Sequence, residues 1–159
     1  NLSGRRITLS TCGIISGIYD LADNGPALRL AVSLTTADEA LRQQLMPVTA
    51  GNPLPKLKEA IAYYIKKTGR RCTLEAALLA GKNTGRESAK RLIDFARDLN
   101  CHVNLIPWNP VEGLPFQEPS TKECKDFIFQ LEHAGINVTL RHRRGRKIGG
   151  ACEKKKKTE

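Results

Sequence analysis

The sequence predicts an α/β fold of about five strands with helical crossovers, either a partial (β/α) barrel or an open parallel sheet. Short apolar, strand-like runs alternate with segments whose apolar residues recur at helical spacing. This alternation favours parallel strands joined by right-handed crossovers. The 159 residues are enough for one sizeable core, and no repeat of about 20–50 residues is evident.

Each expected element follows from a local pattern. Strands are expected at residues 7–10, 28–34, 72–79, 103–106 and 136–140, and the first of them is expected to be short and buried. Helices are expected at residues 13–23, from about 37 onward, and at 53–67, 87–99 and 120–134. Thr36 is expected to cap the second helix, and Ser120 and Glu123 to form a capping box for the last one. The alanines in 72–79 leave a helix possible there.

Positive charge is concentrated at the C-terminal end. The net charge is +10, and residues 141–159 contribute +7 of it through nine Lys or Arg against two Glu. We therefore predict a core, residues 1–140, and a basic C-terminal arm, residues 141–159. Such an arm can bind nucleic acid by releasing counterions from phosphates, although a solubilising tail is the alternative. The candidate RNA-binding residues are Arg141, Arg143, Arg144, Arg146 and Lys147.

Composition and cysteine spacing exclude several classes of protein. The chain is 40% hydrophobic and 26% charged, which is typical of globular proteins. Without an apolar run of about 18 residues or a visible signal peptide, no membrane partner is expected. The five cysteines are far apart and odd in number, which argues against a secreted disulfide framework and excludes a sequence-local zinc or iron–sulfur motif. We expect a cytoplasmic location and no metal ligands in this chain.

Small polar groups follow or lie near the ends of the predicted strands. These are Ser10, Ser33-Leu34-Thr35, Glu75, Asn104, and Asn109 in an exposed-looking Trp-Asn-Pro corner. Parallel α/β folds bind ligands at the carboxyl ends of their strands. Asn offers both donors and acceptors, and proline stiffens its loop. The alternative is that the Ser and Thr residues are only turn and cap residues.

Cys152 is the candidate nucleophile. It follows Gly149-Gly150 and lies near Arg and Lys residues, whose positive charge would lower the thiol pKa. The glycine pair would allow an arm that carries this thiol to move. The alternative is an incidental thiol in a tail.

Several of these segments resemble motifs of the RlmN/Cfr family of radical S-adenosylmethionine methyltransferases, which methylate an adenine of 23S ribosomal RNA. The most specific match is Asn-Leu-Ile-Pro-Trp-Asn-Pro at residues 104–110. Further matches lie at residues 7–13, 31–35, 45–48, 73–75, 144–145 and 151–152. The resemblance therefore covers nearly the whole chain.

The resemblance implies roles for the candidate residues. Ser10, Ser33-Leu34-Thr35 and Asn109 would contact S-adenosylmethionine. Cys152 would be the catalytic residue: its thiol is methylated, and the methyl carbon is then transferred to C2 of adenine. This route suits an unactivated ring carbon, at which direct polar methyl transfer would fail. Ribosomal RNA, with tRNA as an open second choice, would be the partner, and a 4Fe-4S cluster would serve the complete enzyme.

The sequence also departs from the family pattern. The Cys-x-x-x-Cys-x-x-Cys motif that holds the cluster, the Gly-Glu segment and the N-terminal RNA-binding domain are absent. Thr35 replaces a family His, and the residues around Arg146 and after Cys152 differ. The chain thus resembles the C-terminal part of such an enzyme, beginning inside the barrel and inactive without its N-terminal part. The alternatives are a non-catalytic RNA-binding fragment and an α/β domain for an unrelated small ligand.

Overall fold

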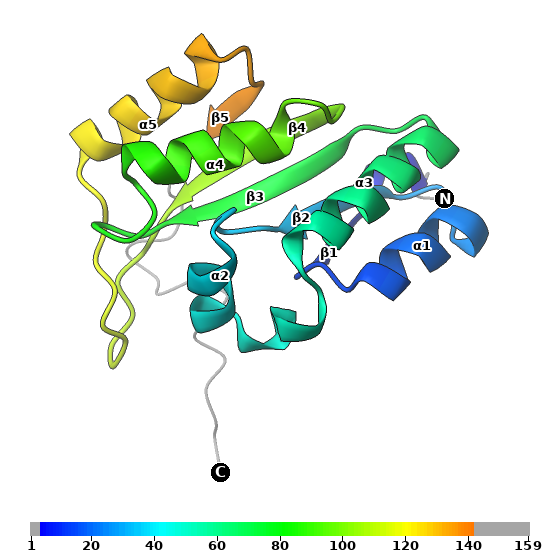
Figure 1. The fold of residues 1–159 in the computed structure, drawn as a ribbon, viewed down its shortest axis with the longest axis horizontal. Helices are drawn as coiled ribbons and strands as arrows, with labels where there is room; N and C mark the ends of the chain where they lie inside the picture. Colours follow the sequence, from blue (N-terminus) through cyan, green and yellow to red (C-terminus); the bar gives the residue numbers. More distant parts are fainter. Residues whose placement is uncertain (1–3, 142–159) are drawn as a thin grey trace.

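The computed structural model describes residues 4–141, in which five strands form one parallel sheet (Figure 1). The strands are β1 Thr8–Thr11, β2 Arg29–Ser33, β3 Cys72–Leu78, β4 Cys101–Pro107 and β5 Val138–Leu140. The α-helices are α1 Ile15–Asn24, α2 Glu39–Leu45, α3 Leu54–Thr68, α4 Arg86–Ala96 and α5 Thr121–His133. Short 3-10 helices lie at η1 Gly4–Arg6 and η2 Pro47–Gly51. The predicted α/β class and element order are confirmed.

The strands are neighbours in chain order, and each pair is parallel. Crossovers of one hand then place the helices over the same face of the sheet, as Figure 1 shows. Leu74 and Val103 point to that face and are fully buried, whereas Glu75 and Asn104 point to the other face and are half-buried. This is the arrangement of a barrel segment, with helices outside and an open inner face.

Helix α3 shows how the sequence pattern produces the packing. Its apolar residues recur every three or four positions, and Leu57, Ala60, Ile61 and Tyr64 are at most 1% exposed. Each large apolar side chain buried in this way contributes roughly 1.5–3 kcal/mol. Gly69 ends the helix in the left-handed region at φ +66°, where a side chain would be strained.

The first strand differs from its prediction. We expected it to be buried, but β1 is exposed because it lies at the sheet edge and pairs only with β2. Ile7 and Leu9 are 44% and 43% exposed. An edge strand of this kind offers unpaired backbone groups and apolar side chains to a further strand.

The structure also corrects or settles the element ends. Asp38, and not Thr36, caps α2, because its side chain accepts the Leu41 N–H at 3.0 Å. The capping box of α5 is confirmed, since Ser120 and Glu123 bond each other's backbone N–H. Residues 72–78 form a strand, which removes the helical alternative, and α4 ends three residues before its predicted end. Among residues 4–141, no helix is long and apolar enough to cross a membrane.

Candidate functional site

The predicted binding residues lie at or beyond the carboxyl ends of three strands. Ser10 is the penultimate residue of β1, Ser33 is the last of β2, and Asn109 follows the end of β4 by two residues. Because the sheet is parallel, the carboxyl ends of all strands lie at the same end of the sheet. We call this end the rim and define it as residues 10–13, 33–36 and 108–109. Ser10 is exposed there, whereas Ser33 and Asn109 are half-buried.

A row of polar side chains crosses the inner face of the sheet below the rim. The strand register places Ser33 beside Glu75, Glu75 beside Asn104, and Asn104 beside Thr139. The Thr139 hydroxyl lies 3.4 Å from Asn104 Oδ1 and 2.8 Å from His102 Nε2. Burial, aided by a nearby positive charge, lowers the pKa of His102 and favours a neutral ring. The row offers a carboxylate, donors and acceptors to a polar ligand.

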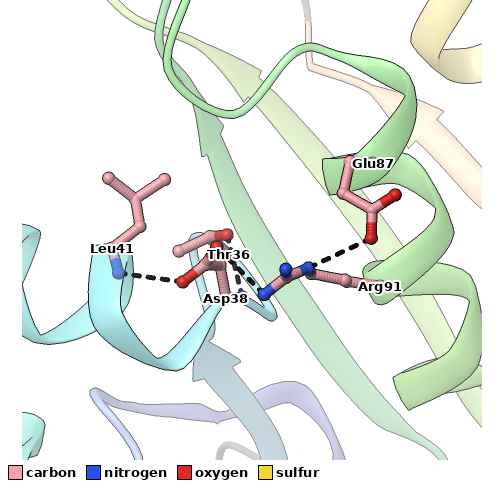
Figure 2. Close-up of polar contacts among 5 residues, drawn as sticks. All are labelled: Thr36, Asp38, Leu41, Glu87 and Arg91. Atoms are coloured by element: carbon pink, nitrogen blue, oxygen red, sulfur yellow. Dashed lines mark hydrogen bonds and ion pairs between the residues drawn. The ribbon is translucent and has the colours of Figure 1, made fainter.

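The segment that follows β2 is fixed by side-chain contacts (Figure 2). The Thr36 hydroxyl accepts the Asp38 N–H at 3.1 Å instead of capping the helix directly. Arg91 of α4 donates to Asp38 Oδ2 at 3.0 Å and lies 3.5 Å from Glu87 Oε1. Figure 2 shows Arg91 reaching from α4 towards the start of α2. The rim segment is thus tied to two helices.

Thr35 has a strained backbone. Its φ of +62° lies in the left-handed region, which β-branched residues rarely adopt. Its N–H donates to the Glu75 carbonyl at 3.0 Å. Strain of this kind persists only where the surroundings enforce it, and it clusters at ligand-binding segments. The strained residue is also one of the predicted S-adenosylmethionine contacts.

The Trp-Asn-Pro corner is less exposed than its composition indicates. Trp108 and Asn109 are half-buried, and only Pro110 is exposed. The Trp108 ring contacts Phe116 edge to face at a centroid distance of 5.5 Å, and the backbone N–H of Trp108 donates to the Leu78 carbonyl at 2.9 Å. The loop after β4 therefore folds back on itself and carries Asn109 at the end of β3 and β4.

Two buried polar residues near the rim were not found by sequence reasoning. Arg42 in α2 is 0% exposed and Asn83 in the turn after β3 is 2% exposed. An arginine in a short polar helix and an asparagine in a Gly-Lys-Asn turn are normally exposed, so the sequence carries no signal for either. Both side chains bind backbone groups of the rim loops.

Most of the predicted arm lies outside the described residues. Cys152, Arg143, Arg144, Arg146 and Lys147 belong to that part, so their roles and the division at residue 140 remain predictions. Arg141 is described: its side chain is exposed, and its backbone N–H donates to the carbonyl of Leu105 in β4. Within residues 4–141, no three His, Cys, Asp or Glu side chains group together as a metal site would require.

A hollow of about 360 Å³ lies away from the rim. It is lined by Arg29, Arg70, Arg71 and Thr73, which belong to the amino ends of β2 and β3. None of these three arginines forms an ion pair within the described part of the chain. The hollow therefore lies at the sheet edge opposite the predicted binding residues and is not part of the candidate site.

Comparison with known proteins connects this geometry to a family. No family model matches the chain. It is 56% identical over 152 residues to a probable dual-specificity RNA methyltransferase RlmN of Treponema denticola, and 43% identical to the RlmN of Halalkalibacterium halodurans. Each match covers 96% of this chain but only 44% and 42% of the relative. The chain thus spans less than half the length of the curated relatives it matches.

The chain corresponds to the C-terminal part of an RlmN protein. A radical SAM methyltransferase from Sphaerobacter thermophilus superposes with a TM-score of 0.92 at 40% identity, over 96% of this chain and 45% of that one. A domain of a pyruvate-formate lyase-activating enzyme from Bacteroides vulgatus shares the fold alone, with a TM-score of 0.64 and 17% identity. The RlmN assignment therefore agrees with the strand order and the one-sided helical layer.

Proposed function

We propose that this chain is the C-terminal part of a radical S-adenosylmethionine methyltransferase that methylates C2 of an adenine in 23S ribosomal RNA, with tRNA as a second substrate. The 56% identity to a dual-specificity RNA methyltransferase over nearly the whole chain carries this proposal. The 0.92 TM-score with a radical SAM methyltransferase supports it. RNA substrates of this kind place the enzyme in the cytoplasm.

The rim residues Ser10, Ser33-Leu34-Thr35 and Asn109 are proposed to bind S-adenosylmethionine. The nearby polar row and the fixed loop after β2 support this role, because the cofactor presents amino, carboxylate and hydroxyl groups that need both donors and acceptors. S-adenosylmethionine supplies the methyl group of the reaction. The Cys152 thiolate is proposed to take that methyl group on sulfur, with S-adenosylhomocysteine as the leaving group, and to hold its carbon for transfer to adenine, while the rim holds the cofactor in place.

The iron–sulfur cluster of the family does not fit the described part of this chain. No three possible ligands come together in residues 4–141, and the cysteines described there are separated along the sequence. The cluster ligands would belong to the N-terminal part of a complete enzyme. The chain's own contributions are cofactor binding at the rim and, through residues 141–159, the nucleophilic thiol and RNA contacts.

A fused enzyme tests the proposal. The N-terminal part of the Treponema denticola relative would be joined ahead of this chain and expressed in bacteria that lack their own RlmN. We expect 2-methyladenosine in digests of 23S ribosomal RNA by mass spectrometry. The Cys152→Ala form of the same fusion should give none, whereas Cys101→Ala, at the amino end of β4 and outside the rim, provides a thiol control that keeps methylation. A fusion that accumulates as folded protein but leaves adenine unmodified would contradict the proposal.

A second function, RNA binding without catalysis, is favoured by the charge of the arm, +7 over residues 141–159. With roughly five to seven phosphate contacts, the slope of log affinity against log salt would be about −4 to −6. Deleting residues 141–159 should flatten the slope, and Cys152→Ala should leave it unchanged. If the fusion does not methylate while the isolated chain shows this slope, RNA binding is the better description.

A further inference from the structure

Arg42 joins two loops of the rim. Its Nε donates to the Leu34 carbonyl at 3.2 Å, and its Nη2 donates to the Cys12 carbonyl at 2.6 Å. Cys12 follows β1 and Leu34 follows β2, so one guanidinium spans the gap between adjacent strand ends. The fit is close, because a Cβ at Gly13 would lie 2.9 Å from Arg42 Nη2. Gly13 is also left-handed, at φ +99°, so both space and backbone conformation require glycine there.

Burying an arginine at position 42 costs desolvation free energy. Its side chain is fully buried and forms no ion pair with any carboxylate of residues 4–141. Burial lowers its pKa, and the nearby Glu39 only partly offsets this effect. Nη1 is buried without a hydrogen-bond partner in the described part of the chain. An apolar side chain would avoid these desolvation costs, so packing alone does not account for an arginine.

Asn83 joins the loop that follows β2 to the end of β3 and the turn after it. Its Nδ2 donates to the Thr35 carbonyl at 3.0 Å and to the Ala77 carbonyl at 2.7 Å. Its Oδ1 accepts the Leu79 N–H at 2.8 Å. Asn83 is 2% exposed, so these bonds do not compete with bulk water. The side chain therefore fixes the end of β3 to the loop that follows β2.

The two side chains bind the backbone on either side of the strained Thr35 Cα. Arg42 holds the Leu34 carbonyl and Asn83 holds the Thr35 carbonyl, which are consecutive along the chain. The peptide groups on both sides of the Thr35 Cα are thereby anchored to different elements. This arrangement supplies the external constraint that a left-handed threonine needs.

We propose that Arg42 and Asn83 are positioning residues for the S-adenosylmethionine site. They tie the loops after β1, β2 and β3 at fixed separations and hold Ser33-Leu34-Thr35 in one conformation before the cofactor binds. Neither residue is assigned a contact with the cofactor; each acts through the backbone that carries the contacts. The inference rests on the proposed cofactor site, and it adds a reason for that site to be preorganised.

The test combines cofactor titration with amide hydrogen exchange on the 159-residue chain. S-adenosylmethionine would be titrated against the unchanged chain, Arg42→Met, Arg42→Lys, Asn83→Asp and the control Arg97→Met. Arg97 is an exposed arginine at the C-terminal end of α4, away from the rim. Exchange would be followed for residues 12–14 and 34–36, and circular dichroism would confirm that each variant folds.

We expect Arg42→Met to weaken binding at least tenfold and to speed exchange in both segments, with the rest of the sheet unchanged. Arg42→Lys should lie between, because an ammonium keeps the charge but lacks the fork that reaches two carbonyls. Arg97→Met should match the unchanged chain. If Arg42→Met fails to fold, Arg42→Lys and Asn83→Asp decide the question by the same readouts.

The outcomes separate this inference from the proposed function. Failure of the unchanged chain to bind S-adenosylmethionine would overturn the cofactor site and the inference that rests on it. Binding that stays unchanged in folded Arg42 and Asn83 variants would overturn the positioning role alone. In the Arg42 variants, weaker binding with uniformly faster exchange would show a general loss of stability, and would also overturn it. Because Asn83→Asp also lowers global stability, that variant is judged by whether exchange in residues 34–36 speeds up more than exchange in the rest of the sheet.

Discussion

Replacing Asn83 by alanine tests how much stability a single buried amide contributes at the junction of β2 and β3. The side chain makes three hydrogen bonds to backbone groups, at 2.7, 2.8 and 3.0 Å. Each such bond contributes about 1 kcal/mol net, and buried groups left without a partner add to the loss. We therefore expect Asn83→Ala to lower the free energy of unfolding by about 3 kcal/mol.

Urea denaturation followed by circular dichroism measures this effect. With a slope near 2 kcal/mol/M, typical of a small domain, the unfolding midpoint should fall by about 1.5 M while the slope stays unchanged. Lys82→Ala is the matched control, because Lys82 is exposed in the same turn and its replacement should change stability by less than about 0.5 kcal/mol.

The Asn83→Asp variant distinguishes the contribution of the hydrogen-bond acceptor of this side chain from that of its two donated bonds. The carboxylate can still accept the Leu79 N–H, but it cannot donate to the two carbonyls and instead repels them. We expect a loss at least as large as that of alanine at neutral pH. A loss below about 1 kcal/mol in Asn83→Ala would refute the reasoning, since the three backbone groups would then have satisfactory alternatives.

Three more measurements test other parts of the structure. Thr35→Asn should raise the free energy of unfolding by roughly 0.5–1 kcal/mol in urea titrations, because asparagine tolerates the left-handed region. Burial raises the pKa of Cys72 to about 12 and that of Cys101 to about 11. Mass spectrometry should therefore show that iodoacetamide at about pH 8 leaves both thiols unmodified in the native chain and alkylates them in urea. Hydrogen bonding to the Ser120 N–H lowers the folded-state pKa of Glu123. The stability that this carboxylate adds to the folded chain is therefore fully present above its unfolded-state pKa and is lost as pH falls through its folded-state pKa. Glu123→Gln should reduce that acid-side loss in urea titrations from about pH 6 to about pH 3; an unchanged profile would contradict the assignment.

The sequence was sufficient for the architecture because its signals are local and periodic. Spacing in residues 53–67 predicts the buried face of α3, and the Ser120 and Glu123 pair predicts the start of α5. The exposure of β1 was not predictable in this way. An apolar strand reads as buried whether or not a neighbour covers it, and only the sheet order shows that Leu9 lies at an edge.

The rim divides into residues that a motif can indicate and residues that only the tertiary structure reveals. Ser33 and Asn109 stand at strand ends, where polar side chains are conspicuous in an apolar context. Arg42 and Asn83 lie in a polar helix and a polar turn, where nothing in the sequence distinguishes them from exposed residues. Their burial depends on how α2 and the turn after β3 pack over the strand ends, which is a property of the assembled fold.

Thr35 occupies the position at which the family that this sequence resembles has a histidine. The conformation at this position is fixed by backbone groups: the Thr35 N–H bonds Glu75, and its carbonyl bonds Asn83. Neither bond involves the Thr35 side chain, so a different residue can occupy the position while the loop keeps the same anchors. The threonine adds local strain, which the anchors on both sides resist. The departure at residue 35 therefore alters the side chain offered at the rim without removing the contacts that shape it.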